Sequence, residues 1–94
     1  MTCERIEYTE HALRRLKERR ISKDEVEYVL MNYQELLYDV EEKHYVFINY
    51  NLKLVVVADL EDNTCIVVTL YPSTKLGKLV AKRKRNKRWV EVEL

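Results

Sequence analysis

The sequence predicts a single α+β domain, residues 1–94, in which an N-terminal helical hairpin packs on an antiparallel sheet of four or five strands. Residues 54–60 and 64–71 are two runs rich in Val and Ile that are separated by a short polar segment, as in two strands joined by a turn. Both runs are almost continuously apolar, which is typical of a sheet covered on most of its surface. Two segments with helical periodicity precede them, and these are the candidates to cover the sheet.

The first helix is expected from residue 10 to about Arg20. Thr9 carries a hydroxyl of the kind that caps helix N-termini, and Glu10 places a negative charge in the first turn, where it suits the helix dipole. Ala12 and Leu16 recur at the spacing of one apolar face. Residues 1–7 are too few and too mixed in character to assign to an element.

A second helix is expected to begin at the capping box of Ser22 and Glu25 and to end near Asn32. From residue 35 the period changes, and residues 36–40 and 43–50 are expected to be strands separated by a turn. Such short links imply antiparallel neighbours, because a parallel return requires a crossover of roughly a dozen or more residues. In the basic segment 73–94, a short helix from about Thr74 followed by a strand is expected.

Composition places the chain among globular proteins, with 35% charged residues and only one Gly and one Pro. Many charges with few Gly and Pro are typical of heat-adapted proteins, which indicates a thermophilic source. No apolar run approaches the ~20 residues of a membrane helix and no signal-peptide pattern is present, so a cytoplasmic protein without a membrane partner is expected. Cys3 and Cys65 form neither a metal-spaced pair nor a disulfide framework, and we expect both to be reduced.

The first helix holds the main candidate catalytic residues, His11, Arg15 and Arg19. Residues four apart lie one above the other on a helix, so these side chains are predicted to form one ridge. Histidine can move a proton near neutral pH, and arginine binds phosphate through a planar set of donors. The alternative interpretation is an ordinary solvated helix face.

The end of the last predicted strand carries Thr69 and Tyr71 before Pro72 stops it. Hydroxyl groups at a strand end can bind a phosphate, so Tyr71 is a further candidate catalytic residue, although tyrosine is also a common structural residue of strands. His44, the other histidine, is interpreted as a surface residue of the second strand.

The C-terminal segment concentrates positive charge. Residues 73–88 contain eight Lys or Arg and no acidic residue, so a net charge of +1 combines +8 in this segment with −7 elsewhere. Such asymmetry indicates a polyanion or an acidic protein as partner. With aromatic residues nearby, it fits RNA, and the predicted RNA-binding residues are Lys78, Lys82, Arg83, Lys84, Arg85, Lys87 and Arg88. A solvated tail docked on an acidic partner is the alternative.

Several enzyme classes are excluded by missing motifs. There is no Gly-rich phosphate loop, no Cys or His set with metal spacing, and no Gly-x-Ser-x-Gly elbow. We therefore expect no cofactor and no metal, and any catalysis should be acid–base chemistry.

The first helix and the last strand carry a resemblance to a known group of proteins. The residues concerned are Glu10-His11-Ala12, Arg15, Arg19, Ile21-Ser22 and Val67-Val68-Thr69-Leu70-Tyr71. In this order, with a second short helix between, they resemble a family of small uncharacterised prokaryotic domains related to the RelE/ParE and BrnT toxins. The resemblance covers roughly residues 8–72.

The resemblance implies a RelE-like, helices-then-sheet fold and the activity of a toxin in a toxin–antitoxin system. Such toxins are often metal-independent ribonucleases that an antitoxin holds inactive. On that expectation the ribose 2′-hydroxyl attacks the adjacent phosphate, His11 or a lysine or tyrosine moves protons, and Arg15 and Arg19 stabilise charge. The alternative function is a non-catalytic module that binds RNA or protein.

Overall fold

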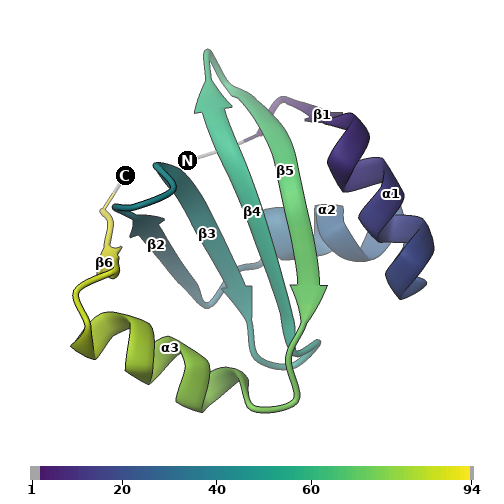
Figure 1. The fold of residues 1–94 in the computed structure, drawn as a ribbon. Coiled ribbons are helices and arrows are strands. Elements are labelled where there is room, and N and C mark those ends of the chain that lie inside the picture. Colours follow the sequence, from purple (N-terminus) through teal and green to yellow (C-terminus); the bar gives the residue numbers. More distant parts are fainter. Residues whose placement is uncertain (1–2, 94) are drawn as a thin grey trace.

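The structure is a computed structural model that describes residues 3–93, and it places helices on both faces of one sheet (Figure 1). The sheet has the strand order β1-β5-β4-β3-β2-β6. Its strands and helices, in chain order, are β1 (Arg5–Tyr8), α1 (Glu10–Arg19), α2 (Lys23–Met31), β2 (Glu35–Asp39), β3 (His44–Asn49), β4 (Leu54–Glu61), β5 (Thr64–Pro72), α3 (Leu76–Arg85) and β6 (Trp89–Glu91).

The predicted architecture of an N-terminal helical hairpin on a four- or five-stranded antiparallel sheet was wrong. A strand, β1, precedes the first helix, and it pairs in parallel with β5, so the six-stranded sheet is mixed. Strands β2 to β5 do form the expected antiparallel order. β1 was missed because it has four residues of mixed character, and its pairing partner lies far along the chain, beyond both helices and three strands.

Both predicted helix starts are confirmed. Thr9 Oγ1 accepts a hydrogen bond from the Ala12 N–H at 3.1 Å. Ser22 Oγ accepts one from the Glu25 N–H at 3.1 Å, and the Glu25 carboxylate accepts one from the Ser22 N–H at 3.0 Å, which completes the capping box. These caps satisfy amide groups that have no partner within a helix, and they separate α1 from α2 by a short link.

Helices α1 and α2 cover one face of the sheet (Figure 1). Ala12 and Leu16 of α1 are buried with Val26, Val29 and Leu30 of α2. They pack against apolar residues of the central strands, among which Phe47, Val56, Val67 and Leu70 are fully buried. This apolar layer is the larger of two cores.

Helix α3 covers part of the opposite face, so the basic segment is a helix followed by a strand, as expected. Leu76 and Val80, one turn apart, are buried against the sheet together with Trp89 of β6. The charged side chains of α3 therefore surround a narrow apolar contact. In Figure 1, α3 lies below the sheet near the ends of β3 and β5, which leaves part of this face uncovered by helices.

Cys3 and Cys65 are joined by a disulfide, with a Cα–Cα distance of 5.4 Å, so the prediction that both are reduced was wrong. The parallel pairing of β1 with β5 explains the proximity, because Ile6 is the register partner of Cys65 and the Glu4 N–H donates to Asn63 O at 2.8 Å. Both cysteines are buried. Since β1 was not predicted, this contact could not be anticipated.

No helix among residues 3–93 has both the length and the apolar character that crossing a membrane requires.

Candidate functional site

A cavity of about 380 Å³ lies on the sheet face that α3 only partly covers. Its apolar lining comes from Val46, Val57 and Val68 of three adjacent strands. The polar and aromatic groups that line it come from every layer of the molecule: His11, Asp39, Glu42, His44, Thr69, Tyr71, Arg83, Arg88 and Trp89. Both histidines of the chain are thus in one cavity.

An extra residue in β5 positions α1 beside the cavity. Val57 pairs with Thr69 but Ala58 pairs with Val67, so Val68 is a bulge residue without its own partner. The backbone around the bulge binds the start of α1: the Thr9 N–H donates to Val67 O at 3.0 Å, and the Thr9 hydroxyl donates to Val68 O at 3.2 Å. His11 follows two residues later and lines the cavity.

The bulge also sets which β5 side chains face the cavity. Val67 and Leu70 both belong to the core under α1 and α2, although a regular strand would place residues three apart on opposite faces. Thr69 and Tyr71 consequently face the other side and line the cavity. The predicted candidate Tyr71 therefore lines the same cavity as His11.

His44 is held by a carboxylate. Its Nδ1 lies 2.6 Å from Oδ1 of Asp59, and the two residues are cross-strand neighbours, since the adjacent Tyr45 and Ala58 are register partners of β3 and β4. The side chain of His44 is 25% exposed and that of Asp59 is 43% exposed. The interpretation of His44 as a plain surface strand residue did not include this pair, because no sequence pattern linked it to Asp59 fifteen residues away.

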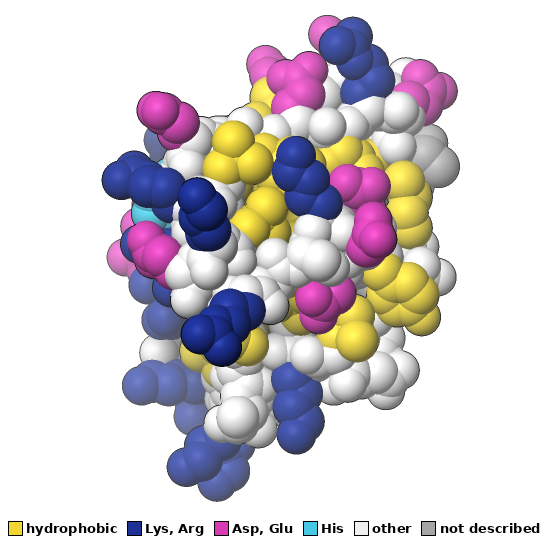
Figure 2. All heavy atoms as spheres, turned by 90° about the vertical axis from the view of Figure 1, so that its right-hand side faces the viewer, with side chains coloured by type: hydrophobic (Ala, Val, Ile, Leu, Met, Phe, Trp, Pro, Cys, Tyr) yellow, Lys and Arg dark blue, Asp and Glu magenta, His cyan; other side chains and the backbone are white. Residues whose placement is uncertain are grey.

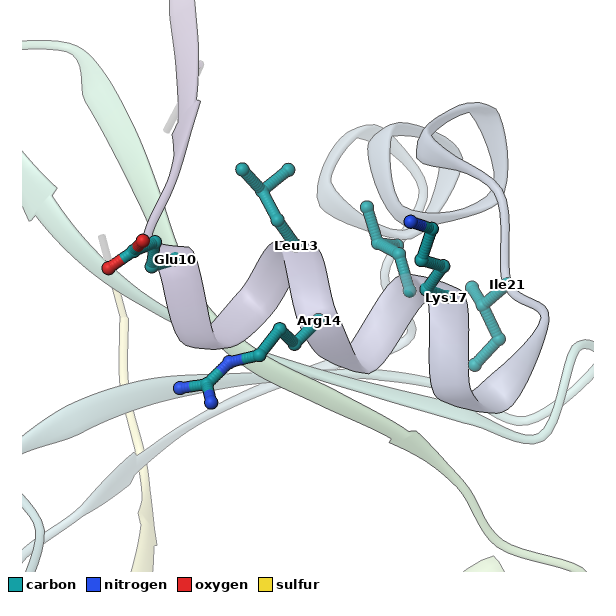
Figure 3. Close-up of a pocket in the computed structure, with 6 residues that line it drawn as sticks. Glu10, Leu13, Arg14, Lys17 and Ile21 are labelled. Atoms are coloured by element: carbon teal, nitrogen blue, oxygen red, sulfur yellow. The ribbon is translucent and has the colours of Figure 1, made fainter.

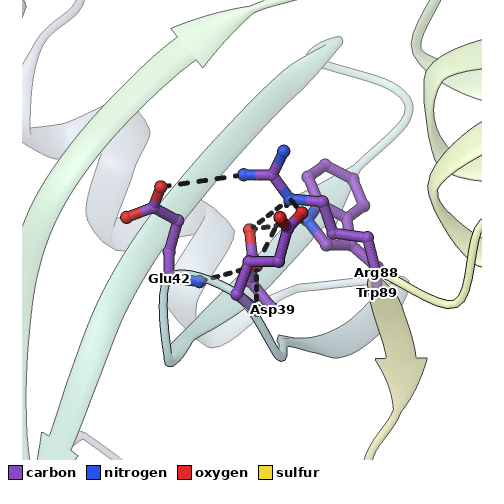
Figure 4. A network of polar contacts seen from close by, with 5 residues as sticks. Asp39, Glu42, Arg88 and Trp89 are labelled. Carbon is purple, nitrogen blue, oxygen red and sulfur yellow. Dashed lines mark hydrogen bonds and ion pairs between the residues drawn. The ribbon is translucent and has the colours of Figure 1, made fainter.

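Asp39 organises the side of the cavity next to β6 (Figure 4). Its carboxylate accepts bonds from the Glu41 and Glu42 amides at 3.0 Å each and from Trp89 Nε1 at 3.1 Å, and Arg88 Nε lies 3.4 Å away. Burial acts to raise the pKa of Asp39, but these donors outweigh it and hold the pKa below its usual value. An Asp two residues before the predicted turn at residues 41–42 was a usable signal for the two amide bonds, because Asp often caps turns in this way.

Asp39→Asn should lower the free energy of unfolding by about 1–3 kcal/mol at pH 7, because the donors around residue 39 lose a charged acceptor in a buried place. The folded-state pKa is depressed, so this stabilisation is present above the ordinary carboxyl pKa and disappears as the pH falls through the folded-state value. Urea unfolding at pH 7 and pH 3 measures it. The exposed Asp62→Asn is the control, and an equal loss in both variants would contradict the prediction.

Tyr71 and Arg83 form the part of the cavity nearest α3. Burial raises the pKa of Tyr71 above its usual value, although Arg83 and other cations oppose the shift, so the phenol stays protonated near neutral pH. The Arg83 guanidinium carbon lies 5.7 Å from the centre of the Trp89 ring. Its buried Nε has no hydrogen-bond partner, and no ion pair involves Arg83 within residues 3–93. Arg83 is therefore a cation in the cavity wall with donors available for an anion.

The three side chains of the predicted ridge on α1 do not share one site. His11 lines the cavity, whereas Arg15 does not and instead pairs with Glu18 at 2.6 Å. Arg19 is exposed, donates to Leu70 O, and has its guanidinium carbon 5.8 Å from the Tyr71 ring centre. Of the predicted catalytic set, His11 and Tyr71 thus share the cavity, and Arg19 supports Tyr71 from outside it.

Some of the predicted RNA-binding residues are held in internal ion pairs, and others are exposed. Lys84 pairs with Glu35 and Glu91, and Arg88 pairs with Asp39 and Glu41. These two cations bind the C-terminal segment to the sheet. Lys78, Lys82, Arg85 and Lys87 are exposed, and they could contact a polyanion without breaking an internal pair.

A second hollow, of about 480 Å³, lies on the outer surface of α1 (Figure 3). Leu13, Leu16 and Ile21 supply its apolar part, and Glu10, Arg14 and Lys17 surround them. Figure 2 shows this side of the molecule, where hydrophobic patches lie between side chains of both charges. The hollow contains no histidine, tyrosine or cysteine, so it can bind but offers little for catalysis.

In the part of the chain that the structure describes, no group of three or more His, Cys, Asp or Glu side chains could hold a metal ion.

Comparison with known protein families identifies a match over most of the chain. A family described as "Domain of unknown function (DUF4258)" matches residues 8–72, which include His11, the His44–Asp59 pair and Tyr71 but not α3 or β6. No curated protein and no solved structure matches the chain. Because the matched residues make up more than half of the chain, the protein belongs to the DUF4258 family.

Proposed function

We propose that this protein is a toxin-like RNA-binding protein that cleaves RNA without a metal ion, as the toxin of a toxin–antitoxin system. The observation that carries the proposal is the meeting of His11 and His44 in one cavity with the cation Arg83. Transfer of a phosphoryl group from the 5′-oxygen to the 2′-oxygen of RNA needs a base, an acid and a charge that stabilises the phosphoryl oxygens. These three functions are available there.

The surface around the cavity supports a polyanionic substrate. The exposed cations of α3, Lys78 and Lys82 among them, come from the same helix as Arg83. Tyr71 lines the cavity and supplies an aromatic ring on which an unstacked base could lie. Single-stranded RNA fits this combination better than a duplex, whose bases are not free to stack on protein.

The proposed location is the cytoplasm of a heat-adapted organism. Disulfides are rare in the cytosol of most organisms, but intracellular proteins of hyperthermophiles are rich in them. The Cys3–Cys65 bond and the composition with few Gly and Pro are both compatible with that setting.

The alternative function, a non-catalytic binding module, is favoured by the apolar hollow around Leu13, which is 42% exposed. An acidic, antitoxin-like protein could contact it, because Arg14 and Lys17 lie beside the apolar residues. This contact would use residues of α1 that do not line the proposed catalytic cavity.

The wild-type protein should cleave a structured RNA with single-stranded loops in excess EDTA, and should leave cyclic-phosphate and 5′-hydroxyl ends. DNA of the same sequence should remain intact, because it lacks the attacking hydroxyl. Salt-sensitive RNA binding without cleavage would favour the non-catalytic module, and neither binding nor cleavage would favour a protein partner.

Arg83→Gln should reduce the slope of log K against log salt for single-stranded RNA by ~0.7, the value for one phosphate contact. The matched control is Arg14→Gln, which removes the same charge from the outer surface of α1 and should leave the slope unchanged. Fluorescence titrations at several salt concentrations measure both slopes. Equal slopes for Arg83→Gln and the wild type would show that Arg83 does not contact a phosphate.

A further inference from the structure

The two histidines of the cavity differ in what holds them. His44 has one ring nitrogen, Nδ1, 2.6 Å from the Asp59 carboxylate, which leaves Nε2 as the nitrogen available to the cavity. His11 is exposed in the first turn of α1, and its imidazole makes no hydrogen bond or ion pair with any residue in the range 3–93. One imidazole is thus oriented and the other is not.

We propose that His44 is the base of the cleavage reaction, that Asp59 is its positioning residue, and that His11 is the acid. The assignment rests on the function proposed above and names the groups that move its protons. It assigns a catalytic role to a residue that neither the sequence interpretation nor the family description singles out.

The carboxylate is the reason for assigning the base to His44. An Nδ1–H that donates to Asp59 fixes the tautomer with a lone pair on Nε2, which is the form that accepts a proton. When Nε2 takes the proton, the imidazolium that forms is stabilised by the adjacent carboxylate, as in other His–Asp pairs. His11 has no such partner among residues 3–93, which leaves it the role of the acid.

The reaction step conserves atoms and protons. His44 Nε2 takes the proton of the 2′-hydroxyl while the 2′-oxygen forms a bond to phosphorus. The bond from phosphorus to the 5′-oxygen breaks, and the 5′-oxygen receives a proton from protonated His11. The products are a 2′,3′-cyclic phosphate and a 5′-hydroxyl, and both histidines then exchange protons with water.

The cleavage rate should depend on pH in a bell shape, because the base must start neutral and the acid must start protonated. Charged groups around His44 contribute to the electrostatic field that sets where the acid and alkaline limbs of this pH profile fall. They are Asp59 on β4, Asp39 on β2, Glu42 in the following turn, His11 on α1, and Arg83 and Arg88 from the C-terminal segment. Substitution of one histidine should therefore remove one limb and shift the other slightly.

An activated substrate separates base from acid. Uridine 3′-(4-nitrophenyl phosphate) has a leaving group that departs without a proton, so His11→Ala should cleave it at close to the wild-type rate. His44→Ala should remain ~10²- to 10⁴-fold slower than wild type on both this substrate and RNA. The reverse pattern, with His44→Ala recovered and His11→Ala slow, would overturn the assignment.

Asp59→Asn tests positioning through a readout that does not depend on activity. In ¹⁵N spectra of the neutral ring, wild-type His44 should carry its proton on Nδ1, and Asp59→Asn should move part of the population to the Nε2–H tautomer. Asp62→Asn in the adjoining turn is the matched control and should leave the spectrum unchanged. An unchanged tautomer in Asp59→Asn would overturn the positioning role.

The outcomes distinguish this inference from the function on which it rests. If the wild type cleaves RNA and a folded His44→Ala does so equally well, the inference fails and the ribonuclease stands. If the wild type cleaves neither RNA nor the activated ester, both fail together.

Discussion

Reduction of the Cys3–Cys65 disulfide should lower the free energy of unfolding by about 4 kcal/mol, which is the chain-entropy value for a loop of this length. The bond connects residues separated by 62 positions, so it closes most of the chain into one loop and restricts the unfolded state strongly. Urea unfolding in the presence and absence of a reductant measures the difference.

The control is a Cys3→Ala, Cys65→Ala double variant. It should unfold at the lower urea concentration of the reduced wild type, and the reductant should not change its midpoint. A wild-type midpoint that does not respond to a reductant, when the protein unfolds reversibly, would show that the bond adds no stability. Denaturing mass spectrometry after thiol alkylation reports independently whether the bond is present.

The effect should be large because β1 is otherwise weakly held. It has four residues, lies at the sheet edge, and pairs with β5 over Arg5 to Tyr8 only. The strand leads directly into Thr9, which binds the bulge in β5 and so determines where α1 begins. The disulfide therefore stabilises the attachment of the helix that carries His11.

Local signals in the sequence predicted the local structure well. Side-chain caps placed the starts of α1 and α2, since Thr9 and Ser22 bond to amides only three residues away. The dense Val and Ile of β4 and β5 predicted the centre of the sheet because residues with this stiffness fit a pleated, covered surface. The apolar contact of α3 was less visible, since Leu76 and Val80 stand among many basic residues.

Contacts between distant segments could not be predicted. β1 is too short for a clear period of two, and although a C-terminal strand was expected, the partners of β1 and β6 are identified only by the complete sheet. The disulfide and the contact between Trp89 and Asp39 depend on those two strands. His11 and Tyr71 were identified from chemistry alone, but their proximity depends on a bulge at Val68 that has no signature in a run of β-branched residues.

The residues of the predicted ridge on α1 also differ in what they contact. Arg15 and His11 are one helical turn apart, yet only His11 lines the cavity, because Arg15 is paired with Glu18 on the same helix. Regular spacing along a helix shows that side chains are neighbours. It does not show which of them faces a site made by other elements.

His11→Ala should therefore slow RNA cleavage by ~10²- to 10⁴-fold, the usual contribution of a group that transfers a proton in the transition state. Arg15→Ala should leave the rate close to the wild-type value, because this side chain pairs with Glu18 and does not line the cavity. Single-turnover cleavage of one RNA in excess EDTA, with enzyme above substrate, measures both rates without interference from product release.

The control for the helix itself is Lys17→Ala, which shortens an exposed side chain of α1 on the outer surface and should leave the rate unchanged. Circular dichroism establishes that each variant keeps its α1 structure. An equal loss of rate in His11→Ala and Arg15→Ala would contradict the cavity as the catalytic site. The site would then lie on the predicted ridge of α1, because both side chains would have to contact the substrate. A loss confined to His11→Ala supports a site in which α1 contributes one histidine and the opposite strands and α3 contribute the remaining groups.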